Sequence, residues 1–153
     1  MGDHERPLTI GWRERVDLPE WRIRGLRAKI DTGARTSAVD VAQFEHLDND
    51  DIRFEIVIRL KPERKTKWVR ATPIRTSVVK PSHGETQERP VCLTRVRIGA
   101  HEYGIELGLV CRKNMLCRML IGREALKDRF VVDVSEKYLL SERARKPRKG
   151  EPS

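Results

Sequence analysis

The segment KIDTGARTS, residues 29–37, ends an apolar, β-prone run with an abrupt turn. Gly33 can adopt backbone angles that a residue with a Cβ resists, so the chain can reverse sharply after Asp31. Thr32 adds a hydroxyl that both donates and accepts hydrogen bonds. A carboxylate held at the tip of a rigid turn suits acid–base catalysis. The same tripeptide also occurs as an ordinary turn in which Asp closes a local hydrogen bond. From the tripeptide alone, both interpretations stay open.

Outward from this segment, the sequence predicts short strands separated by turn-forming residues. They cover residues 8–12, 23–30, 38–47, 52–60, 68–71, 74–79, 91–98, 103–110, 119–122 and 130–134. Residues 16–21 are predicted as a turn followed by an extended piece, and residues 61–65 as a charged turn. The clearest pattern is in residues 52–60, where Ile52, Phe54, Ile56, Ile58 and Leu60 alternate with mostly charged residues. This period of two predicts that these five side chains share one buried face.

Only one helix is predicted, about two turns over residues 123–129. Residues 80–90 contain Pro81, Gly84 and Pro90 and are predicted as an exposed loop or hairpin tip. Strands and helices do not alternate, which argues against a parallel doubly wound sheet. We therefore expect an all-β fold, either a closed barrel or a sandwich.

The chain has 153 residues, 38% hydrophobic and 36% charged, which predicts one soluble domain with a real core. We place this domain at residues 1–140. The net charge of +9 and the pI near 9.9 favour an anionic partner. Part of the charge lies in residues 141–153, where five basic residues outnumber two glutamates. This segment is predicted to be a disordered basic tail, which serves either solubility or attraction to RNA or acidic protein.

Cysteine and histidine spacing gives no support for a disulfide framework or a metal site. Cys92, Cys111 and Cys117 are odd in number and form no Cys-x-x-Cys pair, so we expect reduced, partly buried thiols. The four histidines are scattered, with no zinc-binding spacing. The sequence also lacks an apolar run long enough to span a bilayer and an apolar N-terminal signal. We expect no metal, no other cofactor, no membrane contact and a cytoplasmic location.

Four segments in this order resemble a known family. They are residues 29–38, 84–91, 119–126 and 129–139. The order of strand, Asp-Thr-Gly-Ala, hairpins, Leu120-Ile121-Gly122 and short helix is similar to a retropepsin-type aspartic protease subunit. More closely, the chain resembles small retropepsin-like proteins of bacteria and archaea long labelled ATP-dependent zinc proteases. The resemblance runs from about Gly11 to Leu140, and implies a retropepsin-like closed β-barrel with one short C-terminal helix.

The old family label fits these residues poorly. No Gly-x-x-x-x-Gly-Lys segment is present to bind ATP phosphates, and zinc ligands are lacking, as argued above. One position also departs from the family pattern, since Asp40 stands where the family often has histidine. Any role of that histidine is lost or altered in this chain.

Aspartic protease chemistry requires two carboxylates that share one proton, because like charges at contact distance do not both ionise easily. This chain has one Asp-Thr-Gly and no second copy of the motif, since Asp17, Asp128 and Asp133 lie in other contexts. The second carboxylate must come from another subunit. A two-fold axis through the Asp31 loop supplies it, and the mechanism therefore predicts a homodimer.

The resemblance assigns roles to individual residues. Asp31, Thr32 and Gly33 form the catalytic loop, with Asp31 as the acid–base carboxylate and Thr32 hydrogen-bonded across the dimer axis. Leu120 and Ile121 are expected to pack beneath this loop, and Gly122 to allow close backbone approach. Five further residues are predicted to contact substrate. They are Ala34, Arg35, Gly84, Arg89 and Arg123.

Each of these five residues has a proposed part in binding substrate. Ala34 keeps the loop small enough for substrate to pass, and Gly84 lies in the predicted flap that covers the cleft. Arg35, Arg89 and Arg123 can each bind a carboxylate bidentately, which suggests an acidic peptide or protein substrate, unless each pairs with a local acid. The resemblance further implies work beside ATP-grasp ligases that add glutamates to a ribosomal protein, hence ribosome association.

Two other functions remain compatible with the sequence. The first is a non-catalytic basic β-domain that binds RNA, the ribosome or acidic protein, and its affinity should fall steeply with salt. Few aromatic residues are available for base stacking, since the chain has three Trp, two Tyr and three Phe. The second is a metallopeptidase, as the family label says, which stoichiometric zinc in the purified protein would support.

Overall fold

The computed structural model describes residues 6–80, 84–111 and 116–141. In these residues the chain forms strands, one short α-helix and two 3-10 turns, at Pro19–Trp21 and Asp48–Asp50. The α-helix is α1, Arg123–Leu126. The strands are β1 (Leu8–Gly11), β2 (Arg13–Leu18), β3 (Ile23–Asp31), β4 (Ser37–His46), β5 (Ile52–Arg59), β6 (Lys65–Ala71), β7 (Arg75–Val79), β8 (Gln87–Ile98), β9 (His101–Val110), β10 (Met119–Gly122) and β11 (Phe130–Asp133).

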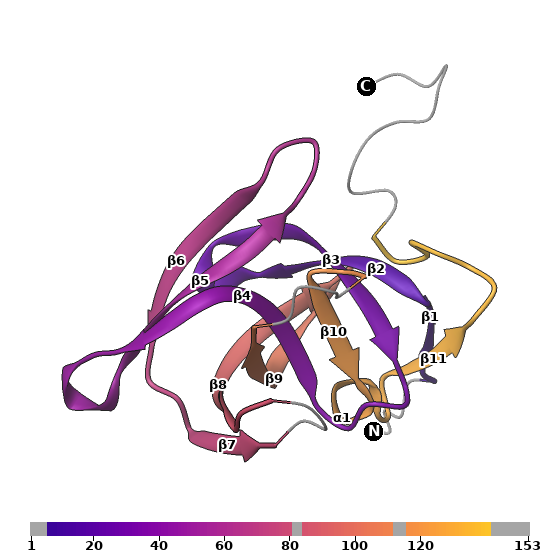
Figure 1. The fold of residues 1–153 in the computed structure, drawn as a ribbon. Coiled ribbons are helices and arrows are strands. Elements are labelled where there is room, and N and C mark those ends of the chain that lie inside the picture. The colour runs from indigo at the N-terminus through magenta and orange to yellow at the C-terminus, as the bar shows by residue number, and fades with distance from the viewer. Residues whose placement is uncertain (1–5, 81–83, 112–115, 142–153) are drawn as a thin grey trace.

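Six strands close into a barrel, in the order β10, β3, β2, β8, β9 and β4 (Figure 1). The barrel closes because β10 pairs on both edges, parallel to β3 and antiparallel to β4. This all-β architecture confirms the expected retropepsin-like closed barrel. The strand that ends at Asp31 therefore lies in the barrel wall, with β10 between it and the strand that leaves the loop.

Three elements extend this barrel. The β5–β6 hairpin continues from β4, and β7 pairs with the first part of β8. β1 and β11 form a separate two-stranded parallel sheet, in which Leu8 lies opposite Phe130. In Figure 1, β5 and β6 lie at one end of the molecule and α1 lies at the other.

The core fills the barrel with side chains that alternate along the strands. Phe54, Leu26, Leu107, Met119 and Ile121 are among its fully buried members. Burial of aliphatic and aromatic side chains of this size stabilises the fold by about 1.5 to 3 kcal/mol each. A rigid wall of this kind can hold a loop at its rim in a fixed position.

The predicted face of residues 52–60 is correct only in its first half. Ile52, Phe54 and Ile56 are buried as expected, but Val57 is also buried and Leu60 is 47% exposed. The register between β5 and β6 shifts between Val57 and Arg59. Such an irregularity reverses which side chains face inward, and the sequence pattern did not reveal it.

The predicted helix over residues 123–129 is too long, since α1 ends at Leu126. Lys127 already has an extended backbone, with ψ of 132°, and Asp128 adopts a positive φ of 65°. These angles take the chain out of the helix and directly into β11.

Three other boundaries differ from the prediction. The strand predicted at residue 91 begins at Gln87, so Pro90 lies within β8, where β9 has not yet begun to pair. Proline is tolerated there because one edge of the strand has no neighbour needing its N–H. β2 covers Arg13–Leu18, so residues 16–18, the start of the predicted turn, belong to a strand. β6 begins at Lys65, the last residue of the predicted charged turn.

Ser141 is the first residue of the predicted basic tail and the last residue that the structure describes. Ser141 is buried, and its N–H and hydroxyl both donate to the buried carboxylate of Glu14, at 3.1 and 2.7 Å. Glu14 also accepts the N–H groups of Gly11 and Leu139. Ser141 is thus held in the domain, and the rest of the predicted tail, residues 142–153, lies outside the described residues.

Candidate active site

Asp31 is the last residue of β3 and is half-buried at the rim of the barrel. Its Oδ1 accepts the N–H of Gly33 at 3.0 Å, and its backbone carbonyl accepts the N–H of Ala34 at 3.2 Å. Thr32 and Gly33 are exposed. The carboxylate is therefore fixed by the backbone of its own loop, at a tip without bulky side chains.

The structure does not use Gly33 in the way that the sequence predicted. Its backbone does not adopt a positive φ, so the conformational freedom of glycine is not what the turn uses. A Cβ at this position would lie 3.2 Å from Oδ1 of Asp31. The absence of a side chain leaves room for the carboxylate beside the loop.

β10 supports the loop from the barrel side. Its register places Ile121 opposite Ile30 and Gly122 opposite Asp31, with Ile121 fully buried and Leu120 half-buried. A Cβ on Gly122 would lie 2.6 Å from the carbonyl carbon and oxygen of Thr36, a distance that side chains do not reach. Only glycine at position 122 lets the two backbones meet at this distance.

The same contact is reinforced by hydrogen bonds from the start of α1. The N–H of Arg123 donates to the carbonyl of Ala34 at 2.8 Å, and that of Glu124 to the carbonyl of Arg35 at 3.1 Å. The Arg123 guanidinium donates to the carbonyl of Gly33 at 3.2 Å. Arg123 forms no ion pair with a described acidic residue, and its side chain contacts the Asp31 loop instead. Its expected contact with substrate stays a prediction.

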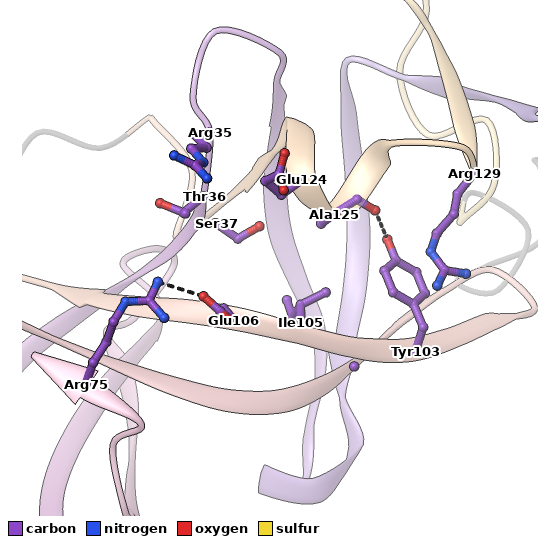
Figure 2. A pocket seen from close by; sticks show the side chains of 11 residues that line it. Arg35, Thr36, Ser37, Arg75, Tyr103, Ile105, Glu106, Glu124, Ala125 and Arg129 are labelled. Atoms are coloured by element: carbon purple, nitrogen blue, oxygen red, sulfur yellow. Dashed lines mark hydrogen bonds and ion pairs between the residues drawn. The ribbon is translucent and has the colours of Figure 1, made fainter.

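A hollow of about 600 Å³ lies beside the loop (Figure 2). Arg35, Thr36 and Ser37 line it on one side, and residues 103–106 of β9 line it on the other. Arg35 is exposed and makes no ion pair with a described residue, whereas Arg75 pairs with Glu106 at 2.6 Å. Arg35 is thus the predicted substrate residue that the structure places in this hollow, whose lining does not include Asp31.

Of the residues that line this hollow, only Arg35 was predicted to contact substrate. The others include Arg75, Tyr103, Glu106 and Arg129. The Tyr103 hydroxyl donates to the carbonyl of Ala125 at 2.6 Å, and Arg129 lies 3.9 Å above the tyrosine ring. Burial raises the pKa of Tyr103 to about 12, with Arg129 acting in the opposite direction. The alternation of residues 103–110 could have marked Tyr103 as inward-facing, but no local pattern places β9 beside the Asp31 loop.

Arg89 and Gly84 do not line the hollow. Arg89 lies opposite Ser77 in the β7–β8 hairpin, and its Nε is buried with no hydrogen-bond partner among the described residues. Gly84 is exposed, with a φ of +107°, between β7 and β8. Since Arg75 of this hairpin borders the hollow, the hairpin adjoins the site, and its role as a flap stays a prediction.

Asp40, which departs from the family pattern, is buried in an ion pair with Arg118. Its N–H also donates to the Arg118 carbonyl at 2.9 Å. The pKa of the neighbouring Cys111 is raised, first by burial and then by the Asp40 charge. Within residues 6–80, 84–111 and 116–141, no three acidic, histidine or cysteine side chains gather as metal ligands.

The sequence profile described as "RimB-like: Retropepsin-like aspartic endopeptidase RimB" matches residues 9–143. The chain belongs to this family. Two curated relatives are each named "Probable alpha-L-glutamate ligase". The one from Shewanella halifaxensis is 31% identical over 145 residues, and the one from Desulfotalea psychrophila is 34% identical over 137 residues. These matches cover 93% and 87% of this chain but only 31% and 29% of the relatives, so the chain spans less than a third of their length.

A solved structure agrees with this assignment at the level of the fold. A Legionella pneumophila protein of unknown function superimposes with a TM-score of 0.71 at 23% identity. The match covers 88% of this chain and 98% of the other. In the described part of the chain, no helix is long and apolar enough to cross a membrane.

Proposed function

We propose that the protein is an aspartic peptidase that works as a homodimer. The observation that carries this proposal is the Asp31 loop, where a carboxylate is held at an exposed tip of small residues on the rim of a closed barrel. Backbone contacts from β10 and α1 fix the loop from below. Acid–base catalysis requires a fixed carboxylate, because a small displacement of a catalytic group lowers the reaction rate strongly.

In the proposed dimer, the Asp31 carboxylates of two subunits share one proton across a two-fold axis. The ionised carboxylate takes a proton from water as the water oxygen attacks the peptide carbonyl, and the protonated one donates to the carbonyl oxygen. The tetrahedral intermediate then collapses as the amide nitrogen takes up a proton and leaves. One water is consumed, and the products are a carboxylic acid and an amine.

An exposed apolar surface supports association with a second copy. Four large apolar side chains are 41–81% exposed on the β1–β11 sheet and the segment after it: Leu8, Val131, Val134 and Leu139. Contiguous exposed apolar surface often marks an interface. Symmetric pairing of identical chains is also the commonest form of oligomer.

We further propose that the substrate is an acidic, glutamate-rich protein tail. Arg35 lies in the hollow beside the Asp31 loop without an acidic partner among the described residues, and a guanidinium binds carboxylates in a bidentate manner. The name of the relatives, glutamate ligase, fits a domain that acts on glutamate-containing products. Association with ribosomes belongs to the same proposal, through the ribosomal protein implied by the family resemblance.

The test is Asp31→Asn in the full chain, assayed on a protein bearing a terminal run of glutamates. This substitution keeps the size of the side chain and removes the acid, so cleavage should fall at least about 10³-fold. The matched control is Asp128→Asn, which alters an exposed aspartate at a positive φ that asparagine also adopts. Mass measurement in solution should give a dimer for all three proteins.

Two results would contradict the proposal. Undiminished cleavage by Asp31→Asn would remove the catalytic role of the loop. A strictly monomeric wild-type protein that still cleaves would remove the shared pair of carboxylates.

A further inference from the structure

A second charged surface lies at the opposite end of the barrel from Asp31. Two adjoining hollows, of about 650 and 860 Å³, share Arg24, Ile58 and Lys65 as lining residues. Together they form the surface that we call the basic groove, between β3 and the β5–β6 hairpin. Arg24 and Asp31 are seven residues apart on β3, which corresponds to about 23 Å along a strand. In Figure 1, the β5–β6 hairpin and α1 lie at opposite ends.

The charges that line the basic groove are almost all positive. Ten lysine and arginine side chains line the two hollows, against Asp17 as the one acid among the described lining residues. The Asp17 carboxylate is already occupied, since it accepts the N–H of Gly25 at 2.9 Å. A groove of this composition repels positive and attracts negative groups over several ångströms.

Several of these cations have no acidic partner within the described residues. Arg24, Arg27, Lys61 and Lys65 form no ion pair there. Three lining arginines differ. Arg97 donates to Glu102 at 2.8 Å, Arg59 pairs with Glu63 at 3.4 Å, and Arg118 pairs with Asp40. The unpaired cations are concentrated where β3 faces β5 and β6, and solvent or a bound anion must balance them.

We propose that the basic groove binds the phosphate backbone of a double-stranded nucleic acid, without reading its sequence. Protein–nucleic acid interfaces are much more positively charged than protein–protein interfaces, and guanidinium groups match phosphate geometry. None of the described lining residues is aromatic, which disfavours a single strand held by base stacking. Binding of an acidic peptide in the same groove is an alternative outcome of the test. This proposal does not depend on peptidase activity.

The experiment compares two triple variants of the full chain. The first is Arg24→Glu/Arg27→Glu/Lys65→Glu, in the basic groove. The second is Lys29→Glu/Lys80→Glu/Lys127→Glu, which changes three exposed lysines outside the groove and alters net charge equally. Both keep residues 142–153, so the contribution of that segment cancels. Circular dichroism checks folding, and the corresponding glutamine triple in the groove serves if charge reversal unfolds the protein.

Binding is measured by fluorescence anisotropy on 20-base-pair RNA and DNA duplexes of one sequence and of a scrambled sequence, over a salt series. Wild-type affinity should fall steeply with salt and be independent of sequence. The groove triple should lose at least about 30-fold at low salt and about three units of the salt slope, whereas the control should lose less than about threefold. Binding of either duplex supports the proposal, and the preferred one identifies the backbone.

Three outcomes would overturn the proposal. The first is absence of duplex binding by the wild type at low salt. The second is equal loss in both triples, which would show that net charge alone is responsible. The third is displacement of bound duplex by an equimolar oligo-glutamate peptide, which would assign the groove to acidic protein.

Discussion

The two ends of the barrel use arginine side chains in different ways. At the Asp31 end, Arg75 pairs with Glu106, Arg123 donates to loop carbonyls and Arg129 lies over Tyr103. At the other end, Arg24 and Arg27 line the basic groove without an acidic partner among the described residues. Paired and hydrogen-bonded cations fix geometry, whereas unpaired cations create a field that acts at a distance. The comparison assigns positional precision to one end and long-range attraction to the other.

The largest effect is expected at Gly122, whose close backbone contact with Thr36 holds the Asp31 loop in place. In Gly122→Ala, the new Cβ meets the Thr36 carbonyl at 2.6 Å, and the backbone on either side must move. We expect a loss of about 4 kcal/mol in the free energy of unfolding, and loss of cleavage. Urea denaturation measures it. The control Gly104→Ala has no closer neighbour than 4.0 Å and should change stability by less than about 1 kcal/mol. Equal effects of the two substitutions would refute the contact.

Glu14 ties the C-terminal segment to β2 close to the same end, since it lies opposite Ala28, three residues before Asp31. Its fully buried carboxylate accepts N–H groups from Gly11 and from Leu139 to Ser141. Glu14→Ala leaves these donors unsatisfied and should cost about 3 kcal/mol in unfolding free energy. Glu63→Ala, at an 80% exposed side chain, should cost less than about 0.5 kcal/mol. If limited proteolysis releases the C-terminal segment no faster in Glu14→Ala, the carboxylate does not anchor it.

The Asp31 loop could be predicted from the sequence because its determinants are local. Asp31, the small residues after it and Gly122 all carry their signal within a few positions, and register then aligns Gly122 with Asp31. The closed barrel followed from strand patterns and the resemblance together. Burial at Val57 could not be predicted, because the bulge that reverses the alternation comes from pairing with β6.

Contacts between segments that are distant in the sequence could not be predicted. Arg75, Tyr103 and Arg129 reach one hollow from three separate elements, and none carries a local signature. The basic groove gathers unpaired cations from residues as far apart as Arg24 and Lys65. Composition predicted an anionic partner, but only the closure of the barrel shows that unpaired cations collect at one end.

Replacing Arg123 distinguishes a residue that positions the Asp31 loop from one that binds substrate. Arg123→Ala removes the hydrogen bond from its guanidinium to the Gly33 carbonyl, and keeps its N–H bond to Ala34. If Arg123 positions Asp31, kcat should fall about tenfold while KM stays within about twofold. If it binds substrate directly, KM should rise instead. Lys127→Ala, at the exposed residue after α1, is the control and should leave both constants unchanged.

Tyr103 makes the stability of the folded protein depend on pH in the alkaline range. Burial raises its pKa from 10 to about 12, so the folded protein keeps the phenol proton where the unfolded chain loses it. Stability is therefore intact below about pH 10 and declines between pH 10 and 12. Tyr103→Phe should cost about 1 kcal/mol at neutral pH, through the lost bond to Ala125, and should reduce this alkaline decline. Tyr138→Phe keeps Tyr103 and should keep the decline; equal alkaline curves for both variants would contradict the assignment.

The smallest expected effect is at the basic groove, where the direction of the change in unfolding temperature is the test. Arg24→Gln removes one cation from a cluster of like charges, so thermal unfolding at low salt should occur about 1 °C higher than in the wild type. Arg97→Gln removes a cation that donates to Glu102 through two nitrogens, so its unfolding temperature should not rise. Salt at about 1 M, where the screening length is about 3 Å, should abolish the gain for Arg24→Gln. A decrease for Arg24→Gln at low salt would mean that Arg24 is compensated within the protein, and the contrast between the two ends of the barrel would then lose its basis.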